Sequence, residues 1–256
     1  MLSVVKIGGA WLGARPRKEA FRALAGLPGE LVVVHGGGKD ISRWLERTGI
    51  PVEWSGGLRV TRGLGLELTA MVLSGWVNKR VVAALSRAGR EAVGISGEDG
   101  GLLRADPVDR ARLGEVGRIR RVDGRVIRGL LSGGYTPVVS PVSAGPEQMP
   151  LNVNADEAAI PLALGIGADR LLLLSDVPGV QAGDRVVEIV DPDVADVLAR
   201  SGVLAGGMLV KVRQALEAAA SGLEVRIGDE RLLAGGSGTR VIASQPSGTT
   251  TEAPGR

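Results

Sequence analysis

Short apolar runs alternate along this chain with longer segments in which apolar residues recur at helical spacing. The short runs predict buried strands, and the longer segments predict helices. Predicted strands cover residues 2–7, 31–35, 92–95, 137–142, 171–175 and 224–227. Predicted helices cover residues 16–27, 40–48, 67–87, 126–131, 154–164 and 208–220. Strands and helices that alternate in this order indicate βαβ units and a largely parallel sheet, which is an α/β fold.

The segments between these elements indicate how the chain is divided. Two adjacent glycines split residues 52–61 into two extended pieces, which predicts a hairpin. Residues 101–124 are expected to be irregular or to form a second hairpin. The order of elements suggests one domain over residues 1–243, with two lobes that part after residue 145 on a continuous sheet. Residues 244–256 have almost no apolar side chains, so we expect a disordered tail.

The side-chain inventory excludes several kinds of site. The chain has 256 residues, of which 44% are hydrophobic but only 2% aromatic, so aliphatic side chains must fill the core. This scarcity of aromatic residues also argues against a base-stacking surface for single-stranded nucleic acid. No cysteine is present, which excludes disulfides, thiol nucleophiles and cysteine-ligated metals. His35 is the only histidine, so a serine–histidine–aspartate triad would have to use it.

Hydropathy and charge narrow the choice of partners. No apolar run approaches the ~20 residues that span a bilayer, and Gly8 and Gly9 interrupt any apolar signal segment near the N-terminus. We therefore expect a cytoplasmic protein. The net charge is +3 and the isoelectric point is about 9.7, but arginines are interleaved with acidic residues. Residues 104–128, the most basic stretch, therefore predict a solvated surface rather than a site for an acidic partner or nucleic acid.

Two glycine-rich turns follow predicted strands. Gly8 and Gly9 follow the first strand, and Gly36, Gly37 and Gly38 follow the second. Glycine lets the backbone approach a ligand closely and turn its N–H groups toward an anion. The carboxyl ends of parallel strands border the ligand crevice of an open α/β sheet. Neither turn has the spacing of a P-loop or a dinucleotide-binding loop, so the turns predict a phosphate site of another kind.

Two of the chain's few lysines occupy locally unfavourable positions. Lys6 lies inside an apolar strand, where an unpaired charge is costly. Lys211 is predicted in the first turn of a helix, where its charge opposes the helix dipole. Such placements indicate function, and the structural alternatives are snorkelling of Lys6 and exposure of Lys211. Asp156 could cap its helix, and Asn152 and Asn154 flank a valine at strand spacing, so they could project to one side together.

These motifs together resemble the amino-acid kinase family, and within it the acetylglutamate kinases. The matching stretches, in family order, are VVKIGGA (4–10), VVHGGGKDI (33–41), GLRVT (57–61), NKRVV (78–82), VGISGEDGGLL (93–103), YTPVVSPV (135–142), NVNADEAA (152–159), LLLLSDVPGV (171–180) and GGMLVK (206–211). They cover nearly the whole chain, and GLRVT with NVNADEAA is a specific combination. The resemblance implies a three-layer α/β/α sandwich with a mainly parallel sheet.

The resemblance also implies a role for each motif residue. Lys6 and Lys211 would bind the phosphates, and Asp156 would orient both lysines. Backbone N–H groups of Gly9 and Gly37 would stabilise the transferred phosphoryl group. The substrate would be bound by Gly36, Gly37, Arg59, Asn152 and Asn154, with Arg59 on its α-carboxylate. The nucleotide would be bound by Gly8, Ser175, Asp176, Gly179, Gly207, Met208 and Lys211.

The implied reaction is transfer of the γ-phosphoryl group of ATP to the γ-carboxylate of N-acetyl-L-glutamate, a step of arginine biosynthesis. This carboxylate is ionised at pH 7 and needs no general base, so catalysis would consist of positioning and charge stabilisation. Mg²⁺ would be held by the phosphates of ATP rather than by protein side chains. The N-terminal lobe would bind the acyl-amino acid and the C-terminal lobe ATP.

By the same resemblance we expect a homodimer with no membrane or nucleic-acid partner. Two alternatives for the substrate stay open. The first is N-succinylglutamate in place of N-acetylglutamate. The second is a glutamate or aminoadipate carried on a small acidic protein, although the relatives that use such a carrier tend to depart from GLRVT and NVNAD.

Overall fold

The first two strands show how the apolar runs become a sheet. In the computed structural model, described for residues 1–8, 11 and 17–244, β1 (Leu2–Ile7) pairs in parallel with β2 (Glu30–His35). Successive side chains of a strand point to opposite faces, and accordingly Val4 packs in one apolar cluster and Val5 in another. A strand that is buried on both faces needs a continuous apolar run, and this explains the sequence of β1.

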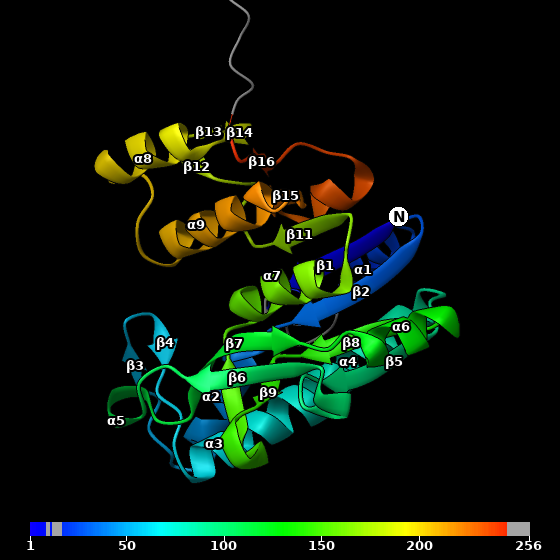
Figure 1. Ribbon diagram of the computed structural model, residues 1–256, viewed down its shortest axis with the longest axis vertical. Helices are drawn as coiled ribbons and strands as arrows, with labels where there is room; N and C mark the ends of the chain where they lie inside the picture. The colour runs from blue at the N-terminus through cyan, green and yellow to red at the C-terminus, as the bar shows by residue number, and fades with distance from the viewer. Residues whose placement is uncertain (9–10, 12–16, 245–256) are drawn as a thin grey trace, which may run out of the picture.

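Within the described residues, eight strands form the central sheet (Figure 1). Their spatial order is β14 (Ile189–Val190), β16 (Thr239–Val241), β15 (Glu224–Gly228), β11 (Arg170–Leu174), β1, β2, β8 (Thr136–Ser140) and β5 (Ala92–Ser96). Neighbouring strands run parallel except β15 and β16. The predicted α/β fold with a mainly parallel sheet is confirmed, and every strand predicted above contributes to this sheet.

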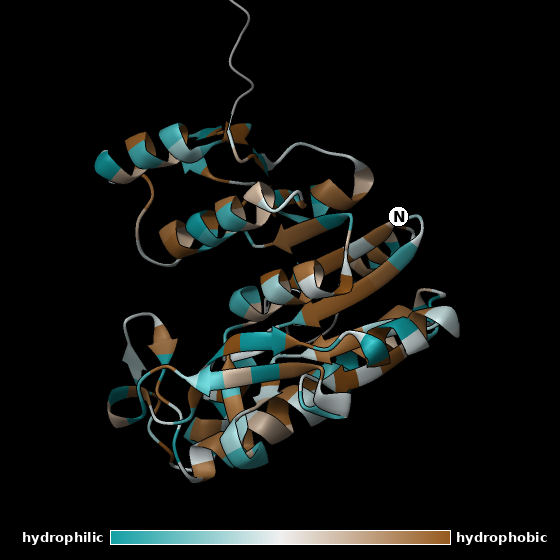
Figure 2. Ribbon diagram, in the orientation of Figure 1, coloured by the Kyte–Doolittle hydropathy of each residue, from teal (hydrophilic) through white to brown (hydrophobic). Residues whose placement is uncertain are grey.

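Helices cover both faces of the sheet. The face of Val4 is covered by α6 (Arg125–Ser132), α7 (Ala155–Ile166), α8 (Pro192–Arg200) and α9 (Gly206–Ala220). The face of Val5 is covered by α1 (Lys18–Ala25), α2 (Gly38–Arg47) and the long helix described next. The hydropathy colouring shows apolar strands between these partly polar helices (Figure 2). The three layers agree with the predicted sandwich.

The long helix predicted for residues 67–87 is present, but it is not regular. It consists of α3 (Leu64–Ala70), a π-helical segment (Met71–Val77) and α4 (Asn78–Arg87). The π-helical segment brings Leu73 against the turn at Gly37, where an added Cβ atom would lie 2.8 Å from Leu73 Cδ2. A larger residue at position 37 would therefore have to displace the end of the Leu73 side chain. A π-helical turn often marks a functional site, and apolar periodicity does not distinguish it from an α-helix.

A small closed barrel lies beside the sheet. Its strands are β6 (Leu103–Pro107), β7 (Val116–Val122), β9 (Val142–Ala144) and β10 (Pro150–Val153). Of the two possibilities for residues 101–124, the hairpin is correct: β6 and β7 are antiparallel, and a single helical turn, α5 (Arg110–Leu113), joins them. The strand predicted to run to residue 142 ends earlier because Pro141 interrupts it, and the chain then enters the barrel.

Two short hairpins complete the described structure. The hairpin predicted over residues 52–61 is confirmed as β3 (Trp54–Ser55) and β4 (Leu58–Arg59). The other hairpin, β12 (Gln181–Ala182) and β13 (Arg185–Val186), was not predicted. Among the described residues no helix is long and apolar enough to cross a bilayer. The predicted tail lies outside the described residues except for Ser244, and so does the start of the helix predicted over residues 16–27.

Candidate active site

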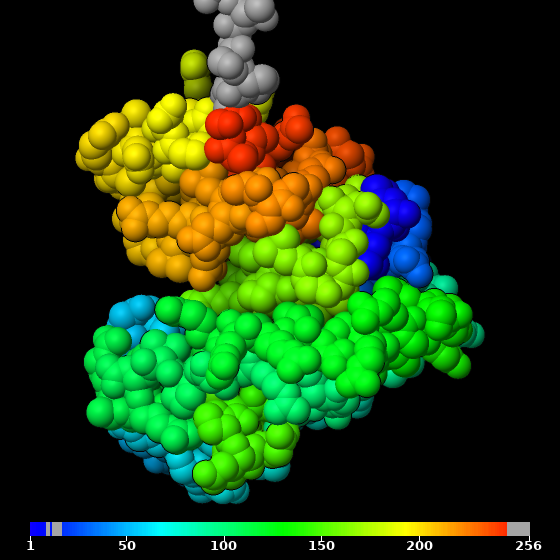
Figure 3. All heavy atoms as spheres, viewed as in Figure 1, coloured from blue at the N-terminus to red at the C-terminus, as the bar shows by residue number. Residues whose placement is uncertain are grey.

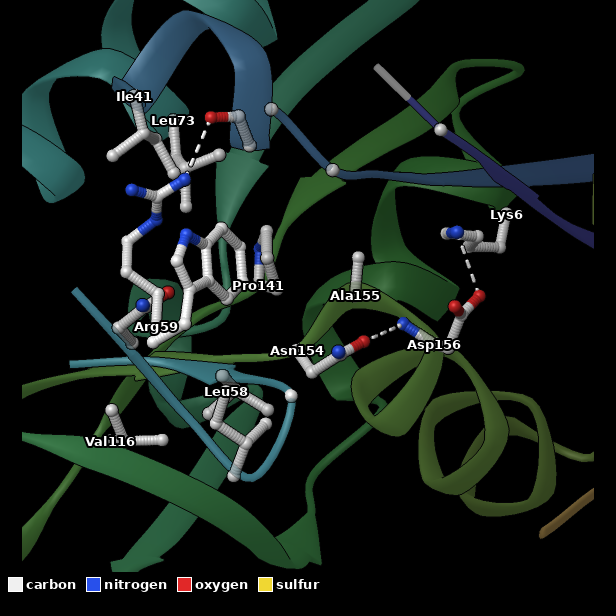
Figure 4. Close-up of a pocket in the computed structure, with 18 residues that line it drawn as sticks. Lys6, Ile41, Leu58, Arg59, Leu73, Val116, Pro141, Asn154, Ala155 and Asp156 are labelled. Carbon is white, nitrogen blue, oxygen red and sulfur yellow. Dashed lines mark hydrogen bonds and ion pairs between the residues drawn. The ribbon is translucent and has the colours of Figure 1, made fainter. Parts of the chain in front are cut away.

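Three charged side chains from distant parts of the chain meet at one edge of the sheet. Lys6 lies near the carboxyl end of β1, Asp156 in the first turn of α7 and Lys211 in α9. Lys6 Nζ lies 2.8 Å from Asp156 Oδ1, and Lys211 Nζ lies 3.5 Å from Asp156 Oδ2. One carboxylate therefore binds both ammonium groups (Figure 4 shows the Lys6 contact). We call these three residues the charged cluster.

The structure also corrects the expected position of Lys211. The helix begins at Gly206 rather than at Met208, so Lys211 lies in its second turn. The helix dipole acts mainly within the first turn, and the opposition expected from it is therefore weaker. The unfavourable setting of Lys211 comes instead from burial: its side chain is 12% exposed.

Burial and charge act against each other within the charged cluster. Burial alone would raise the pKa of Asp156, but the charges of Lys6 and Lys211 outweigh this and lower the pKa below its usual value. Burial lowers the pKa of Lys211, Lys6 lowers it further, and Asp156 offsets only part of the effect. With both lysines protonated, the cluster has one net positive charge. That excess suits an anionic ligand such as a phosphate group.

The two glycine turns border the charged cluster. Gly8 follows β1 directly, and a Cβ atom there would lie 4.0 Å from Lys6 Nζ. Gly36 and Gly37 follow β2, and the helix starts at Gly38 rather than at residue 40 as predicted. The amino end of α2, with its N–H groups and positive dipole end, therefore faces the same space. Gly9 lies outside the described residues.

Arg59 is a buried cation that forms no ion pair with an acidic side chain of the described residues. It projects from the hairpin strand β4 and is 6% exposed. Its Nη2 donates to Gly38 O at 2.9 Å and to Ser42 Oγ at 2.8 Å, and its guanidinium lies 4.5 Å from the ring centre of Trp54. Burial lowers the pKa of Arg59, although Glu46 partly offsets this. Its Nη1 is buried with no hydrogen-bond partner among the described residues.

An unpaired, buried guanidinium N–H is costly unless a ligand completes it. Arg59 lines a cavity of about 250 Å³, which we call the Arg59 cavity (Figure 4). At its other end this cavity reaches Lys6 and Asp156. A carboxylate bound by Arg59 within this cavity would therefore share its space with Lys6 and Asp156.

Asn152 and Asn154 both line the Arg59 cavity, as their spacing suggested. Asn152 Nδ2 donates to Thr61 Oγ1 at 2.9 Å, which leaves its carbonyl oxygen without a partner in the described part of the chain. Asn154 Oδ1 accepts from Asp156 N at 2.9 Å, so Asn154 caps α7. The cap fixes the first turn of the helix, and with it Asp156. The cap of this helix is therefore Asn154, and the suggestion from the sequence that Asp156 could be the cap is wrong.

Two further cavities meet at the charged cluster. One, of about 300 Å³, is lined by Ser175 and Asp176 together with Lys6, Gly8, Lys39 and Lys211, and we call it the Ser175 cavity. The other, of about 400 Å³, is lined by Gly207, Lys211 and the tip of the β3–β4 hairpin. In the space-filling view a notch separates this hairpin from the start of α9 (Figure 3).

The other predicted nucleotide-binding residues have packing contacts. Gly179 lies against Thr239 and Val186: a Cβ atom there would lie 2.7 Å from Thr239 Oγ1. Met208 packs on the apolar cluster of the Val4 face. Neither residue lines the three cavities described above.

The sequence analysis assigned no role to three residues that lie in the cavities or hold their lining residues. Ser42 holds Arg59, Thr61 holds Asn152, and Lys39 lines the Ser175 cavity. Lys39 had a signal, since it is one of few lysines and follows a glycine turn. Thr61 ends the GLRVT motif, but its contact with Asn152 was not predicted, and Ser42 had no signal. Both contacts depend on how the hairpin folds back on α2 and β10.

The chain belongs to the amino acid kinase family, whose sequence profile matches residues 1–229. Within that family it is similar to the acetylglutamate kinase of Geobacillus kaustophilus, with 44% identity over 76% of this chain and 75% of that one. The acetylglutamate kinase of Rubrobacter xylanophilus is 43% identical over 88% of this chain and 87% of its own length.

Solved structures agree on the fold. The crystal structure of smu.665 from Streptococcus mutans has a TM-score of 0.84 at 28% identity, covering 95% of this chain and 99% of that one. The carbamate kinase of Giardia lamblia bound to AMP-PNP has a TM-score of 0.70 at 20% identity, over 95% and 98% of the two chains. At that identity the likeness extends to the fold alone.

Proposed function

We propose that this protein transfers the γ-phosphoryl group of ATP to the γ-carboxylate of N-acetyl-L-glutamate, in arginine biosynthesis. One observation carries the proposal: Arg59, a buried cation, lines the same cavity as Lys6 and Asp156 of the charged cluster. A dicarboxylate can bind Arg59 with one carboxylate and present the other to Lys6. The acetylglutamate kinases that resemble this chain support the same substrate.

The residues of the cavity would act by positioning and by neutralising charge. The γ-carboxylate of the substrate has a pKa of about 4.3 and is already ionised at pH 7. The barrier comes from bringing this anion to the γ-phosphate of ATP. Lys6 would neutralise the group in transfer, Lys211 the leaving phosphate, and Asp156 would hold the two lysines apart. N–H groups of the Gly37 turn would add donors that need no reorganisation.

ATP would enter through the Ser175 cavity, where Asp176 and Lys39 also lie. Among the described residues no group of three or more acidic or histidine side chains is arranged to hold a metal. A divalent ion, which we take to be Mg²⁺, would therefore be bound mainly by the phosphates. When bound, it would neutralise phosphate charge; the lysines would bind the oxygens that remain.

Residues 1–145 would form the acyl-amino-acid lobe and residues 146–243 the ATP lobe. We further propose a cytoplasmic homodimer. The exposed apolar side chains of Met71 and Trp76 on the long helix support a subunit contact. Light scattering of the purified protein tests the dimer: a mass of one chain would exclude it.

The first experiment is acyl-phosphate formation from MgATP, trapped with hydroxylamine. N-acetyl-L-glutamate is compared with N-succinyl-L-glutamate, free glutamate and aspartate. Activity with N-acetylglutamate alone is the expected result. Activity with the succinyl compound alone would change the acyl group, and no activity with any of them would contradict the proposal. A substrate on an acidic carrier would then come first, with the exposed arginines of β7 as its contact surface.

A further inference from the structure

His35 is a buried titratable group that the transfer reaction does not use. It is the last residue of β2, directly before the Gly36–Gly37 turn, and it has no exposed surface. Burial lowers its pKa to about 4; the hydrogen bond to Gly36 opposes this shift and the charge of Lys79 adds to it. The ring is therefore neutral at pH 7, with a proton on only one of its nitrogens.

The partners of His35 decide which nitrogen carries the proton. His35 Nδ1 lies 3.1 Å from Gly36 O, and His35 Nε2 lies 3.1 Å from Asn78 Nδ2. A carbonyl oxygen can only accept, so Nδ1 must be the donor. Nε2 is then unprotonated and accepts from the amide of Asn78.

This assignment depends on the orientation of the Asn78 amide, which its other partners fix. Asn78 Nδ2 lies 2.9 Å from Val138 O and 3.2 Å from Ile95 O, and both are acceptors only. Asn78 Oδ1 accepts from Lys79 Nζ at 3.2 Å, and an ammonium group donates only. Turning the amide over would place oxygen against two carbonyl oxygens and nitrogen against the ammonium group. The two amide hydrogens of Asn78 are shared among Val138 O, Ile95 O and His35 Nε2. Only the Nδ1–H tautomer of His35 leaves no acceptor facing an acceptor and no donor facing a donor.

The hydrogen bond to Gly36 O also fixes a peptide group of the glycine turn. In a trans peptide the C=O and the following N–H point in opposite directions, and the described residues contain no cis peptide. Gly36 O points to the buried ring, so Gly37 N–H points away from it, and Gly37 itself lines the Arg59 cavity. Within the described part of the chain, Gly37 N–H has no acceptor.

We propose that His35 is a positioning residue for the phosphoryl-transfer centre: its Nδ1–H holds the Gly36 carbonyl and so aims the Gly37 N–H at an oxygen of the group in transfer. The role of the Gly37 N–H in phosphoryl transfer rests on the proposed function. The tautomer of His35 and the direction of the Gly36–Gly37 peptide do not. Asn78 and Lys79 act one step further out, since they hold the ring in this tautomer.

The tautomer can be measured without any activity. Because the chain has a single histidine, long-range ¹H–¹⁵N spectra of the wild-type protein contain one imidazole. The expected signals are a protonated Nδ1 and an unprotonated Nε2 at pH 7. A protonated Nε2, alone or in an imidazolium ion, would overturn the proposal even if the enzyme is active. A wild type inactive on every substrate would instead count against the proposed function and leave this result interpretable.

Two amide variants separate positioning from simple packing. His35→Asn places an amide N–H near the Nδ1 position and keeps a donor for Gly36 O. His35→Gln places its amide near the Nε2 position and keeps the contact to Asn78, but loses that donor. We expect His35→Gln to lose about 100-fold in kcat with little change in either KM, and His35→Asn to stay within about 5-fold of wild type.

Stability is measured on the same samples by thermal unfolding. We expect His35→Gln and His35→Asn to differ in kcat while their Tm values stay similar. Equal losses of kcat in both variants, or losses that follow Tm, would show that the ring only packs, and would overturn the positioning role. If neither variant folds, the proposal is tested by the wild-type spectrum alone: a protonated Nδ1 supports it and a protonated Nε2 overturns it.

Discussion

The two ends of the Arg59 cavity handle charge in opposite ways. At one end, Lys6 and Lys211 share the carboxylate of Asp156, so the protein pairs its own charges. At the other end, the only partners of Arg59 among the described residues are neutral acceptors and an aromatic ring, and its Nη1 has no hydrogen-bond partner there. A paired cluster is organised before any ligand arrives, whereas an unpaired cation obtains its counter-ion from the ligand. We therefore expect the first end to control the rate and the second to control substrate binding.

Lys211→Ala should have the largest effect, and it tests whether the charged cluster controls the rate. Loss of the ammonium group removes charge stabilisation of the leaving phosphate, and we expect kcat to fall about 10³-fold with a smaller change in the KM for N-acetylglutamate. Steady-state kinetics of purified protein measure this. Lys18→Ala, an exposed lysine of α1, is the matched control and should be neutral. An unchanged kcat in Lys211→Ala would remove Lys211 from the transfer step.

Asp156→Asn leaves two ammonium groups close together without their carboxylate. Breaking a buried ion pair costs about 3 kcal/mol or more, so we expect a clear loss of Tm at pH 7 and an activity loss of roughly 100-fold. The control is Asp106→Asn, whose partner Arg120 is 3.7 Å away on the surface; such pairs contribute little.

The pH dependence of this variant has a definite sign. The pKa of Asp156 is lower in the folded protein than in the unfolded chain, so its charge stabilises the fold above the unfolded value of about 3.9. That contribution is lost as the pH falls through the folded pKa. The Tm difference between wild type and Asp156→Asn should therefore shrink below about pH 4. A difference that stays constant at acid pH would mean that the lysines do not lower this pKa.

Arg59→Ala tests the other end of the cavity. Charged hydrogen bonds to a carboxylate contribute about 1.5–3 kcal/mol, so we expect the KM for N-acetylglutamate to rise roughly 10- to 100-fold while kcat changes little. Arg59→Lys should not restore binding fully, because an ammonium group lacks the planar fork. Arg62→Ala, on the exposed side of the same segment, serves as the control. If only the KM for ATP changed, the assignment of this end to the acyl-amino acid would be wrong.

Trp54→Ala should have the smallest effect. The exposed ring of Trp54 stacks on Arg59, and a cation–π contact of this kind contributes about 0.5–1 kcal/mol. We expect a 2- to 5-fold higher KM for N-acetylglutamate, and near-normal values for Trp54→Phe because it keeps a ring. An equal effect of both variants would point to the indole N–H instead of the stacking.

The sequence predicted the sheet strands well because they are buried on both faces and stand out as apolar runs. It predicted less of the barrel and the sheet edge: β10 was not expected as a strand, and β14 and β16 are too short for a clear pattern. The π-helical turn escaped because a single wider turn hardly disturbs helical periodicity.

The charged cluster was predictable because lysines in unfavourable places are rare in this chain. The resemblance added Asp156 and Arg59 and placed both near the ligand. The contacts of Arg59 with Ser42 and Gly38 were not predictable, since they depend on where the hairpin folds over α2. The side chain's unpaired Nη1 follows from those contacts and could be seen only in three dimensions.

The single histidine, sealed beneath the glycine turn, has a physiological consequence. Histidine is the side chain that ordinarily changes charge between pH 5 and 8, and here it cannot. Asp156, whose pKa lies below its usual value, stays ionised across that range. Burial lowers the pKa of Lys211, so within the charged cluster it is this lysine, and not the histidine, that responds as the pH rises. The turnover rate should therefore stay level toward acid pH and fall only where Lys211 loses its proton.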